Sequence, residues 1–162
     1  MTNNRTKIRK AIEADYGAVN SLYFETYNLY FRNIPDSYRK TPKRVLPKGT
    51  FLNMIEDEQN ALVVVAEVDN KIVGFLYATI EREDDNEVAR GYNRISVDEV
   101  SVLPNHARRG VGSQLLQEVE KWAKIKKISD LTVLVYDFNK NAINFYSKNG
   151  YVPYSIKMNK KL

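Results

Sequence analysis

The stretch from residue 100 to residue 113 combines an apolar strand pattern, a basic turn with two glycines and the start of a helix. It reads Val-Ser-Val-Leu-Pro-Asn-His-Ala-Arg-Arg-Gly-Val-Gly-Ser. A helix N-terminus leaves its first backbone N–H groups without intrahelical partners and carries about half a positive charge. Gly110 and Gly112 lack a Cβ, which lets backbone donors approach an anion closely, and Arg108 and Arg109 add charge. The stretch therefore predicts a phosphate-binding turn, whereas a bare Gly-x-Gly on its own is also typical of an ordinary tight turn.

Two nucleotide-binding motifs do not fit this turn. A dinucleotide-binding turn needs a third glycine three residues after Gly112, and that position is Leu115. A nucleoside triphosphate loop needs Gly-Lys-Ser/Thr, whereas Gly112 is followed by Ser113 and Gln114. Both classes of nucleotide site are therefore excluded.

Length and composition predict one soluble domain over residues 1–162. A chain of 162 residues buries about 70% of its unfolded surface without needing disulfides or a structural metal. The absence of cysteine excludes disulfides, thiolate metal sites and a cysteine nucleophile. The polar N-terminus has no apolar signal core, and no stretch is long and apolar enough for a membrane span. We expect a cytoplasmic protein that binds neither metal nor membrane.

The net charge of +5 is concentrated in the last third of the chain, where residues 104–162 hold 11 basic and 4 acidic side chains. Such an excess of positive charge attracts a phosphorylated cofactor or a nucleic acid. The lysine run from 121 to 127 also fits the solvated face of a helix. A nucleic-acid-binding module would need basic residues interleaved with exposed aromatics or a docking helix, and neither pattern is evident.

The hydrophobic periodicity predicts alternating strands and helices in the order β-α-α-β-β-β-α-β-α-β. Asp69-Asn70 predicts a tight hairpin turn, and the polar Glu81–Arg90 segment predicts a loop. The expected strands are 8–11, 61–68, 71–80, 94–102, 131–136 and 152–158, and the expected helices begin near 13, 51, 111 and 139 and include 111–125. This order predicts an α/β (α+β) fold, a mixed sheet with helices on both faces.

Two separated motifs resemble the Gcn5-related N-acetyltransferase (GNAT) superfamily, which transfers an acetyl group from acetyl-CoA to an amine. The first is Arg-Arg-Gly-Val-Gly after the strand, similar to Gln/Arg-x-x-Gly-x-Gly/Ala. The second is Asn-Lys-Asn-Ala-Ile-Asn-Phe-Tyr-Ser-Lys-Asn-Gly-Tyr over 139–151. The resemblance implies a mainly antiparallel sheet of six to seven strands. One departure is Ala107, which stands where the family usually has Gln or Arg; its backbone N–H is retained.

The resemblance assigns the cofactor-binding residues. The turn and first helical turn would hold the pyrophosphate of acetyl-CoA, through Arg108, Arg109, Gly110, Val111, Gly112 and Ser113. The backbone of Val100 and Val102 would pair with the pantetheine arm where their strand splays from the next one. Asn139 matches the asparagine that contacts the CoA arm, and it equally fits a helix N-cap.

The resemblance also suggests two catalytic residues for direct attack of the amine in a ternary complex. Tyr146 matches the tyrosine that protonates the departing thiolate, although a tyrosine here can also simply pack the helix onto the sheet. Glu99 is the candidate general base, with a surface carboxylate as the other interpretation. Strand alternation points Asp98 the other way unless a bulge intervenes. The backbone N–H near Val100 would polarise the thioester carbonyl, and His106, the only histidine, is not assigned as the base.

The acceptor is left open between a small amine, a peptide N-terminus and a lysine side chain. Tyr23, Tyr27, Tyr30 and Phe31 form an aromatic cluster that fits either a pocket lining or core packing at helical spacing. A homodimer also stays open. The alternative functions are a non-catalytic acetyl-CoA-binding sensor and a basic nucleic-acid-binding module.

Overall fold

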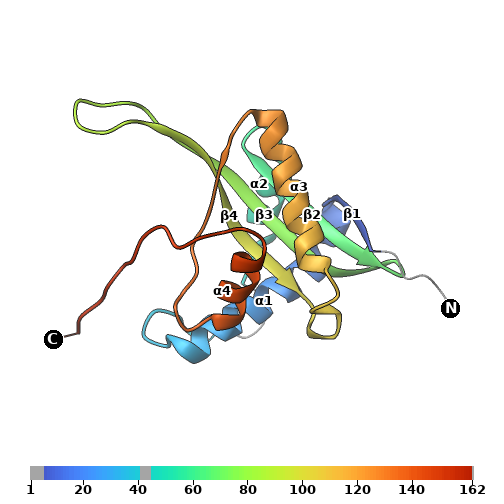
Figure 1. Ribbon diagram of the computed structural model, residues 1–162. Helices are drawn as coiled ribbons and strands as arrows, with labels where there is room; N and C mark the ends of the chain where they lie inside the picture. The colour runs from blue at the N-terminus through green and yellow to red at the C-terminus, as the bar shows by residue number, and fades with distance from the viewer. Residues whose placement is uncertain (1–5, 41–44, 162) are drawn as a thin grey trace.

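The computed structural model describes residues 6–40 and 45–161, which form one sheet with helices packed on both faces (Figure 1). The elements in chain order are β1 (Lys7–Lys10), α1 (Tyr16–Asn33), α2 (Lys48–Glu56), β2 (Ala61–Val68), β3 (Lys71–Glu83), β4 (Tyr92–Val102), α3 (Val111–Lys126), β5 (Asp130–Val133) and α4 (Lys140–Lys148). Short 3-10 helices at Glu13–Asp15 and Pro104–His106 precede α1 and α3. The connection between α1 and α2 contains Pro35, Pro42 and Pro47, of which Pro42 lies outside the described residues.

The sheet follows chain order, β1-β2-β3-β4-β5, so each strand pairs with its neighbours in sequence. The first three pairings are antiparallel, and β4 pairs with β5 in parallel. The predicted β2–β3 hairpin is confirmed: Asp69 and Asn70 both have positive φ, at 50° and 59°, as a two-residue hairpin turn requires. The α3 helix makes the crossover that a parallel β4–β5 pair needs.

The predicted sheet of six to seven strands is wrong, because the described residues form five. The segment 152–158 alternates apolar and polar residues, yet it forms no strand and projects from the body after α4 (Figure 1). Its apolar side chains are 81–89% exposed: Val152, Tyr154, Ile156 and Met158. Alternation predicts which side chains share a face, but a strand also needs a partner edge. The β5 edge is only four residues long and ends before Tyr136, where the sequence predicted it to continue.

The predicted loop over Glu81–Arg90 is shorter in the structure, since β3 runs to Glu83 and β4 begins at Tyr92. Arg94 Nε donates to Glu81 Oε2 at 2.7 Å across the two strands, and its guanidinium lies 4.1 Å from the centre of the Tyr92 ring. Cross-strand charge and cation–π pairs stabilise a polar ribbon whose local composition favours a loop.

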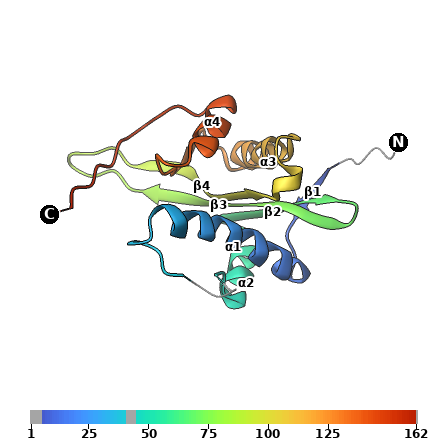
Figure 2. The same ribbon diagram turned by 90° about the horizontal axis from the view of Figure 1, so that it is seen from below.

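The sheet lies between two layers of helices (Figure 2) and separates two hydrophobic cores. On one face α1 and α2 pack around Phe51 and Phe75, and on the other α3 and α4 pack around Leu115, Leu116 and neighbouring side chains. The predicted apolar face of α3 is confirmed, because all six of its residues are buried: Val111, Leu115, Leu116, Val119, Trp122 and Ala123. In the described part of the chain, every helix is too short or too polar to cross a bilayer.

Candidate active site

The turn between β4 and α3 has the geometry of a backbone N–H cradle. Arg108 (φ 60°) and Gly110 (φ 81°) are both left-handed, and Gly110 is the N-cap of α3. The first intrahelical bond runs from Gln114 N to Gly110 O at 3.0 Å. The N–H groups of Val111, Gly112 and Ser113 therefore precede the helical ladder and point out of its N-terminus. The predicted cofactor residues 108–113 are contiguous in this cradle.

Gly112 has a second structural reason to be glycine. A Cβ at this position would lie 3.0 Å from two ring carbons of Phe145 on α4, which is tighter than nine in ten real Cβ contacts. The N-terminus of α3 is therefore held directly against α4, and this brings the two sequence motifs together. Gly110 has no such close neighbour and is fixed instead by its positive φ.

The strands β4 and β5 diverge after four paired residues. Arg94–Val97 pair with Asp130–Val133, and β4 continues alone on this side to Val102. A strand that outruns its partner offers backbone N–H and C=O groups to a ligand. Val100 and Val102 lie in this extension, and their side chains pack against the α3-side core. The predicted splay is present, and Val100 and Val102 lie within it; their pairing with the pantetheine arm stays a prediction.

A β-bulge at Asp98 decides which way Glu99 faces. Tyr77 pairs with Glu99 and Ala78 pairs with Val97, so Asp98 is the additional residue in β4. Val97 belongs to the α3-side core, and simple alternation would send Glu99 to the same face. The bulge shifts the alternation by one residue, and Glu99 instead faces α1. Strand alternation predicted that Asp98 and Glu99 point in opposite directions unless a bulge intervened. The bulge is present, and both side chains line the same pocket.

The Glu99 side chain is a buried carboxyl with one hydrogen-bond donor. The residue is 8% exposed, and its Oε1 accepts from Thr26 Oγ1 of α1 at 2.7 Å. Burial raises the pKa of Glu99 to about 7; the negative charge of Asp98 acts in the same direction and the Thr26 hydrogen bond opposes it. Near neutral pH the carboxyl therefore exists in both forms, as suits a group that takes up and releases a proton.

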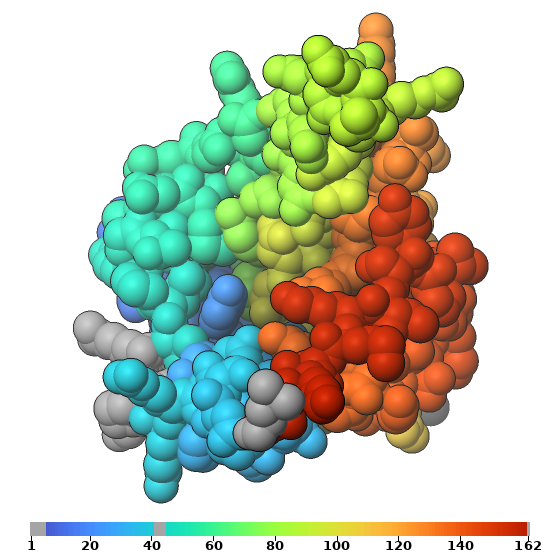
Figure 3. All heavy atoms as spheres, turned by 90° about the vertical axis from the view of Figure 1, so that its left-hand side faces the viewer, coloured from blue at the N-terminus to red at the C-terminus, as the bar shows by residue number. Residues whose placement is uncertain are grey.

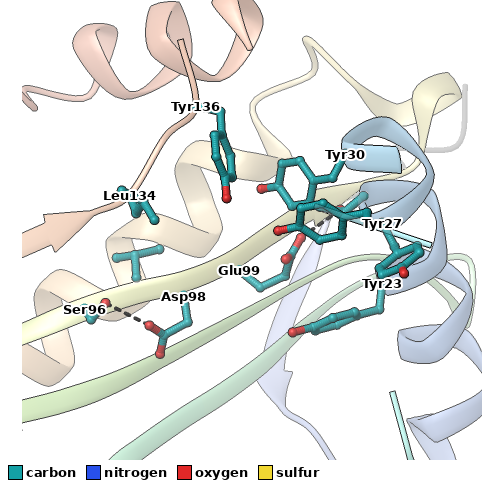
Figure 4. Close-up of a pocket in the computed structure, with 11 residues that line it drawn as sticks. Tyr23, Tyr27, Tyr30, Ser96, Asp98, Glu99, Leu134 and Tyr136 are labelled. Atoms are coloured by element: carbon teal, nitrogen blue, oxygen red, sulfur yellow. Dashed lines mark hydrogen bonds between the residues drawn. The ribbon is translucent and has the colours of Figure 1, made fainter. Parts of the chain in front are cut away.

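A pocket of about 320 Å³ opens above Glu99 on the α1 side of the sheet (Figure 4). Three tyrosines of α1, Tyr23, Tyr27 and Tyr30, extend toward β4, while Tyr136 approaches from the segment after β5. The remaining lining residues are Thr26, Tyr38, Ser96, Val97, Asp98, Glu99 and Leu134. The surface is hollowed where α1, the central strands and the C-terminal part of the chain meet (Figure 3).

Tyr23, Tyr27 and Tyr30 of the aromatic cluster thus line a cavity, and Tyr23 also packs against Phe75 of the α1-side core. Phe31 does not contribute to the lining. Thr26 completes the same helical face. Sequence reasoning missed it, although its position between Tyr23 and Tyr30 at helical spacing was a usable signal. Tyr38 and Tyr136 come from irregular segments, where no periodicity indicates a direction.

Tyr146 lies on α4, in the core on the opposite face of the sheet from the tyrosine pocket. It is 8% exposed and packs against the rings of Phe145 and Tyr151 at 5.1 Å and 5.3 Å. Burial raises the pKa of its phenol above the ordinary value of 10, and the charge of Glu99 raises it further. The phenol therefore keeps its proton at neutral pH. His106, in the 3-10 helix before α3, does not line the pocket.

Asn139 is the N-cap of α4. This confirms one of the two roles that the sequence allowed, the other being a contact with the CoA arm. Asn139 Oδ1 accepts from Ala142 N at 3.1 Å. This bond occupies the carbonyl oxygen of the side chain. The contact with the CoA arm stays a prediction.

The N-cap leads to a stability prediction. Asn139→Ala is expected to lower the free energy of unfolding by about 1 kcal/mol, since it leaves an N-terminal N–H of α4 without a partner. Asn139→Asp keeps the acceptor and should remain within a few tenths of the wild-type value. Urea unfolding of the three proteins measures the difference, and equal stability of Asn139→Ala and wild type would contradict the N-cap assignment.

Comparison with known proteins identifies the family. The profile of the acetyltransferase (GNAT) family matches residues 23–151. The chain is 32% identical over 111 residues to the uncharacterized protein YdhI of Bacillus subtilis, covering 68% of this chain and 59% of that protein. It is 27% identical over 88 residues to an uncharacterized N-acetyltransferase of Lactobacillus delbrueckii, covering 54% of this chain and 50% of that protein. The matches thus span only about half to three fifths of these relatives.

Solved structures share the fold at lower identity. A tetramutant of the BH1408 protein from Bacillus halodurans superposes with a TM-score of 0.90 at 18% identity, covering 96% of this chain and 99% of that one. The aminoglycoside 6'-N-acetyltransferase AAC(6')-Ih of Acinetobacter baumannii gives 0.70 at 18% identity, with 98% and 99% covered. A third, AAC(6')-Iy in complex with CoA, gives 0.65 at 17% identity, with 98% and 95% covered. The protein belongs to the GNAT acetyltransferase family.

Proposed function

We propose that this chain, as a single domain over residues 1–162, transfers the acetyl group of acetyl-CoA to a primary amine by direct attack in a ternary complex. The observation that carries the proposal is the position of Glu99. A buried carboxyl with a pKa near 7 lies in a pocket beside the point where β4 and β5 diverge. Membership of the GNAT family indicates that acetyl-CoA is the acetyl donor.

The N-terminal cradle of α3 would bind the pyrophosphate of acetyl-CoA. Its backbone donors at residues 110–113 are fixed by the helix start, while the side chains of Arg108 and Arg109 are exposed and add long-range attraction. The unpaired backbone of Val100 and Val102 would hold the pantetheine amides. Asn139, the N-cap of α4, would contact the arm through its amide nitrogen, since its Oδ1 already accepts from Ala142 N. No metal is required in this arrangement.

The reaction divides between the two sides of the sheet. Glu99 removes one proton from the incoming ammonium, and the neutral nitrogen then bonds to the thioester carbonyl carbon. The carbon–sulfur bond breaks, Tyr146 gives its proton to the leaving sulfur, and the second nitrogen proton restores the phenol. Glu99 releases its proton to solvent, so one ammonium and one thioester give one amide, one thiol and one proton. The N–H near Val100 would stabilise the negative charge on the carbonyl oxygen.

The proposal is tested by thiol release from acetyl-CoA in the presence of a panel of amines. We expect release with at least one primary amine, with matching amide detected by mass spectrometry. Saturable acetyl-CoA binding without release for any amine would contradict catalysis and support the acetyl-CoA sensor. Salt-dependent DNA retention without acetyl-CoA affinity would support the nucleic-acid alternative.

Backbone geometry should matter more for acetyl-CoA binding than side-chain charge. Gly110→Val introduces a β-branched residue at positive φ, and Gly112→Val collides with Phe145, so each is expected to raise the KM for acetyl-CoA at least about 10-fold. Arg108→Ala and Arg109→Ala remove exposed charges and should each raise it about 3-fold or less. Steady-state kinetics compares the four variants. A larger effect from either arginine would contradict the backbone cradle.

A further inference from the structure

The tyrosine pocket, lined by the eleven residues given above, restricts what kind of amine can be the acceptor. Its walls are aromatic because Tyr23, Thr26, Tyr27 and Tyr30 repeat at i, i+3, i+4 and i+7, which places them on one face of α1. The ring centre of Tyr30 lies 5.3 Å from that of Tyr38 and 5.5 Å from that of Tyr136, and Tyr27 packs edge-on to Tyr38. The rings hold one another in place, so the walls are preformed.

The charge in the pocket is small and lies at one end. Among the described residues that line it, Asp98 and Glu99 are the only charged ones, and none is a lysine or an arginine. Asp98 already accepts hydrogen bonds from Thr79 at 2.7 Å and from Ser96 at 2.8 Å. The tyrosines add no charge, because burial raises the pKa values of Tyr23, Tyr30 and Tyr38 to about 12. The lining can therefore balance positive charge only where Asp98 and Glu99 lie, and not along the tyrosine walls.

The size and polarity of the remaining surface favour a compact apolar body. A cavity of about 320 Å³ lies at the lower end of the range of about 300–1,000 Å³ for small-molecule sites. Away from the carboxylates it is bounded by tyrosine rings, Val97 and Leu134. Ring faces attract an ammonium as it enters and then pack against apolar or aromatic groups. A second ammonium on the same molecule would face these rings without a carboxylate, and cation–π attraction offsets only part of the cost of its desolvation.

From these observations we infer that the acceptor is a small primary monoamine with a compact apolar, preferentially aromatic, body, bound in the tyrosine pocket with its nitrogen at Glu99. This inference rests on the proposed acetyltransferase function. It excludes polycationic acceptors such as aminoglycosides, although enzymes that acetylate them share the fold. The resemblance to those enzymes, at 17–18% identity, concerns the fold and not the lining of the pocket.

The test compares amines that differ in the second charge. At saturating acetyl-CoA, kcat/KM for 2-phenylethylamine is expected to exceed that for 1,6-diaminohexane by about 10-fold or more, and that for kanamycin by about 100-fold or more. Equal or higher kcat/KM for either polycation would overturn the inference while leaving the acetyltransferase function intact. If none of the amines supported thiol release, both the inference and the acetyltransferase function would be overturned.

Variants of one wall residue add an independent measurement. Tyr30→Leu is expected to raise the KM for 2-phenylethylamine about 10-fold and to leave the KM for acetyl-CoA within about twofold, because it removes only a ring face of the pocket. Tyr30→Phe keeps the ring and should recover most of the affinity for 2-phenylethylamine that Tyr30→Leu loses. If Tyr30→Leu does not fold, Tyr136→Leu, outside the helices and strands, provides the same comparison. An unchanged amine KM in a folded ring-deleted variant would overturn the inference.

Discussion

Glu99→Gln is expected to lower kcat about 100-fold, the lower end of what a positioned general base contributes. Glutamine keeps the shape of the side chain and an oxygen that accepts the 2.7 Å hydrogen bond from Thr26, but it cannot take a proton from the ammonium. The KM for acetyl-CoA should change little, because Glu99 faces the α1 pocket and not the cradle at α3. Steady-state thiol release near pH 7.5 gives both parameters.

The same substitution is expected to stabilise the fold at alkaline pH. The pKa of Glu99 is raised from 4.5 to about 7 in the folded protein, so the folded state binds this proton more tightly than the unfolded state. The resulting stability is complete below pH 4.5 and is lost as the pH rises through 7. Above that pH the buried charge costs about 3 kcal/mol, and Glu99→Gln should recover about 2 kcal/mol of it near pH 9. Near pH 4.5 the two proteins should be almost equally stable.

A matched control is Glu118→Gln on α3, whose carboxylate forms a surface ion pair with Lys121. It should leave kcat unchanged and alter the free energy of unfolding by less than about 0.5 kcal/mol at either pH. A Glu99→Gln protein with wild-type kcat would show that Glu99 is not the general base. A Glu99→Gln protein less stable near pH 9 than wild type would show that burial does not destabilise the charged carboxyl.

Tyr146→Phe is expected to lower kcat by about 10- to 100-fold with the KM for acetyl-CoA within about twofold. The substitution removes the proton donor and keeps the ring that packs against Phe145 and Tyr151. Since the pKa of the phenol is raised, the donor is fully protonated at neutral pH, and the loss should be the same at pH 6.5 and pH 8.

Tyr151→Phe provides the comparison for this variant. Its ring lies beside Tyr146, and its buried hydroxyl has no hydrogen-bond partner among the described residues. Removing that hydroxyl should leave kcat unchanged and raise the free energy of unfolding by about 1 kcal/mol. If Tyr146→Phe behaved like Tyr151→Phe, Tyr146 would be a packing residue and the sulfur would receive its proton from another source.

The features that sequence predicted best are those decided by local geometry. The hairpin at Asp69-Asn70 needs two residues that tolerate positive φ, and the turn before α3 needs the glycine at 110; both requirements are visible in the residues themselves. The apolar face of α3 follows from helical spacing alone. In contrast, the segment 152–158 has a strand pattern without a strand, because pairing depends on an edge elsewhere in the chain.

The candidate site was only partly visible in the sequence. Glu99 and Tyr146 were named from the resemblance, but the bulge at Asp98 that turns Glu99 toward α1 depends on the register with β3 and has no signature in a single strand. Thr26, whose hydrogen bond opposes the rise that burial causes in the pKa of Glu99, is 73 residues away in sequence. Contacts of this kind are fixed by tertiary packing.

The Thr26 contact provides the most direct test of Glu99 as the base. At saturating acetyl-CoA, kcat/KM for the amine, corrected for the fraction of the amine present as ammonium, should rise with pH through an apparent pKa near 7. Thr26→Val removes the hydrogen bond that lowers this pKa, so the rise should move to higher pH, whereas Thr26→Ser should keep it in place. A rise at the same pH in all three proteins, or no rise in the wild type, would contradict the assignment.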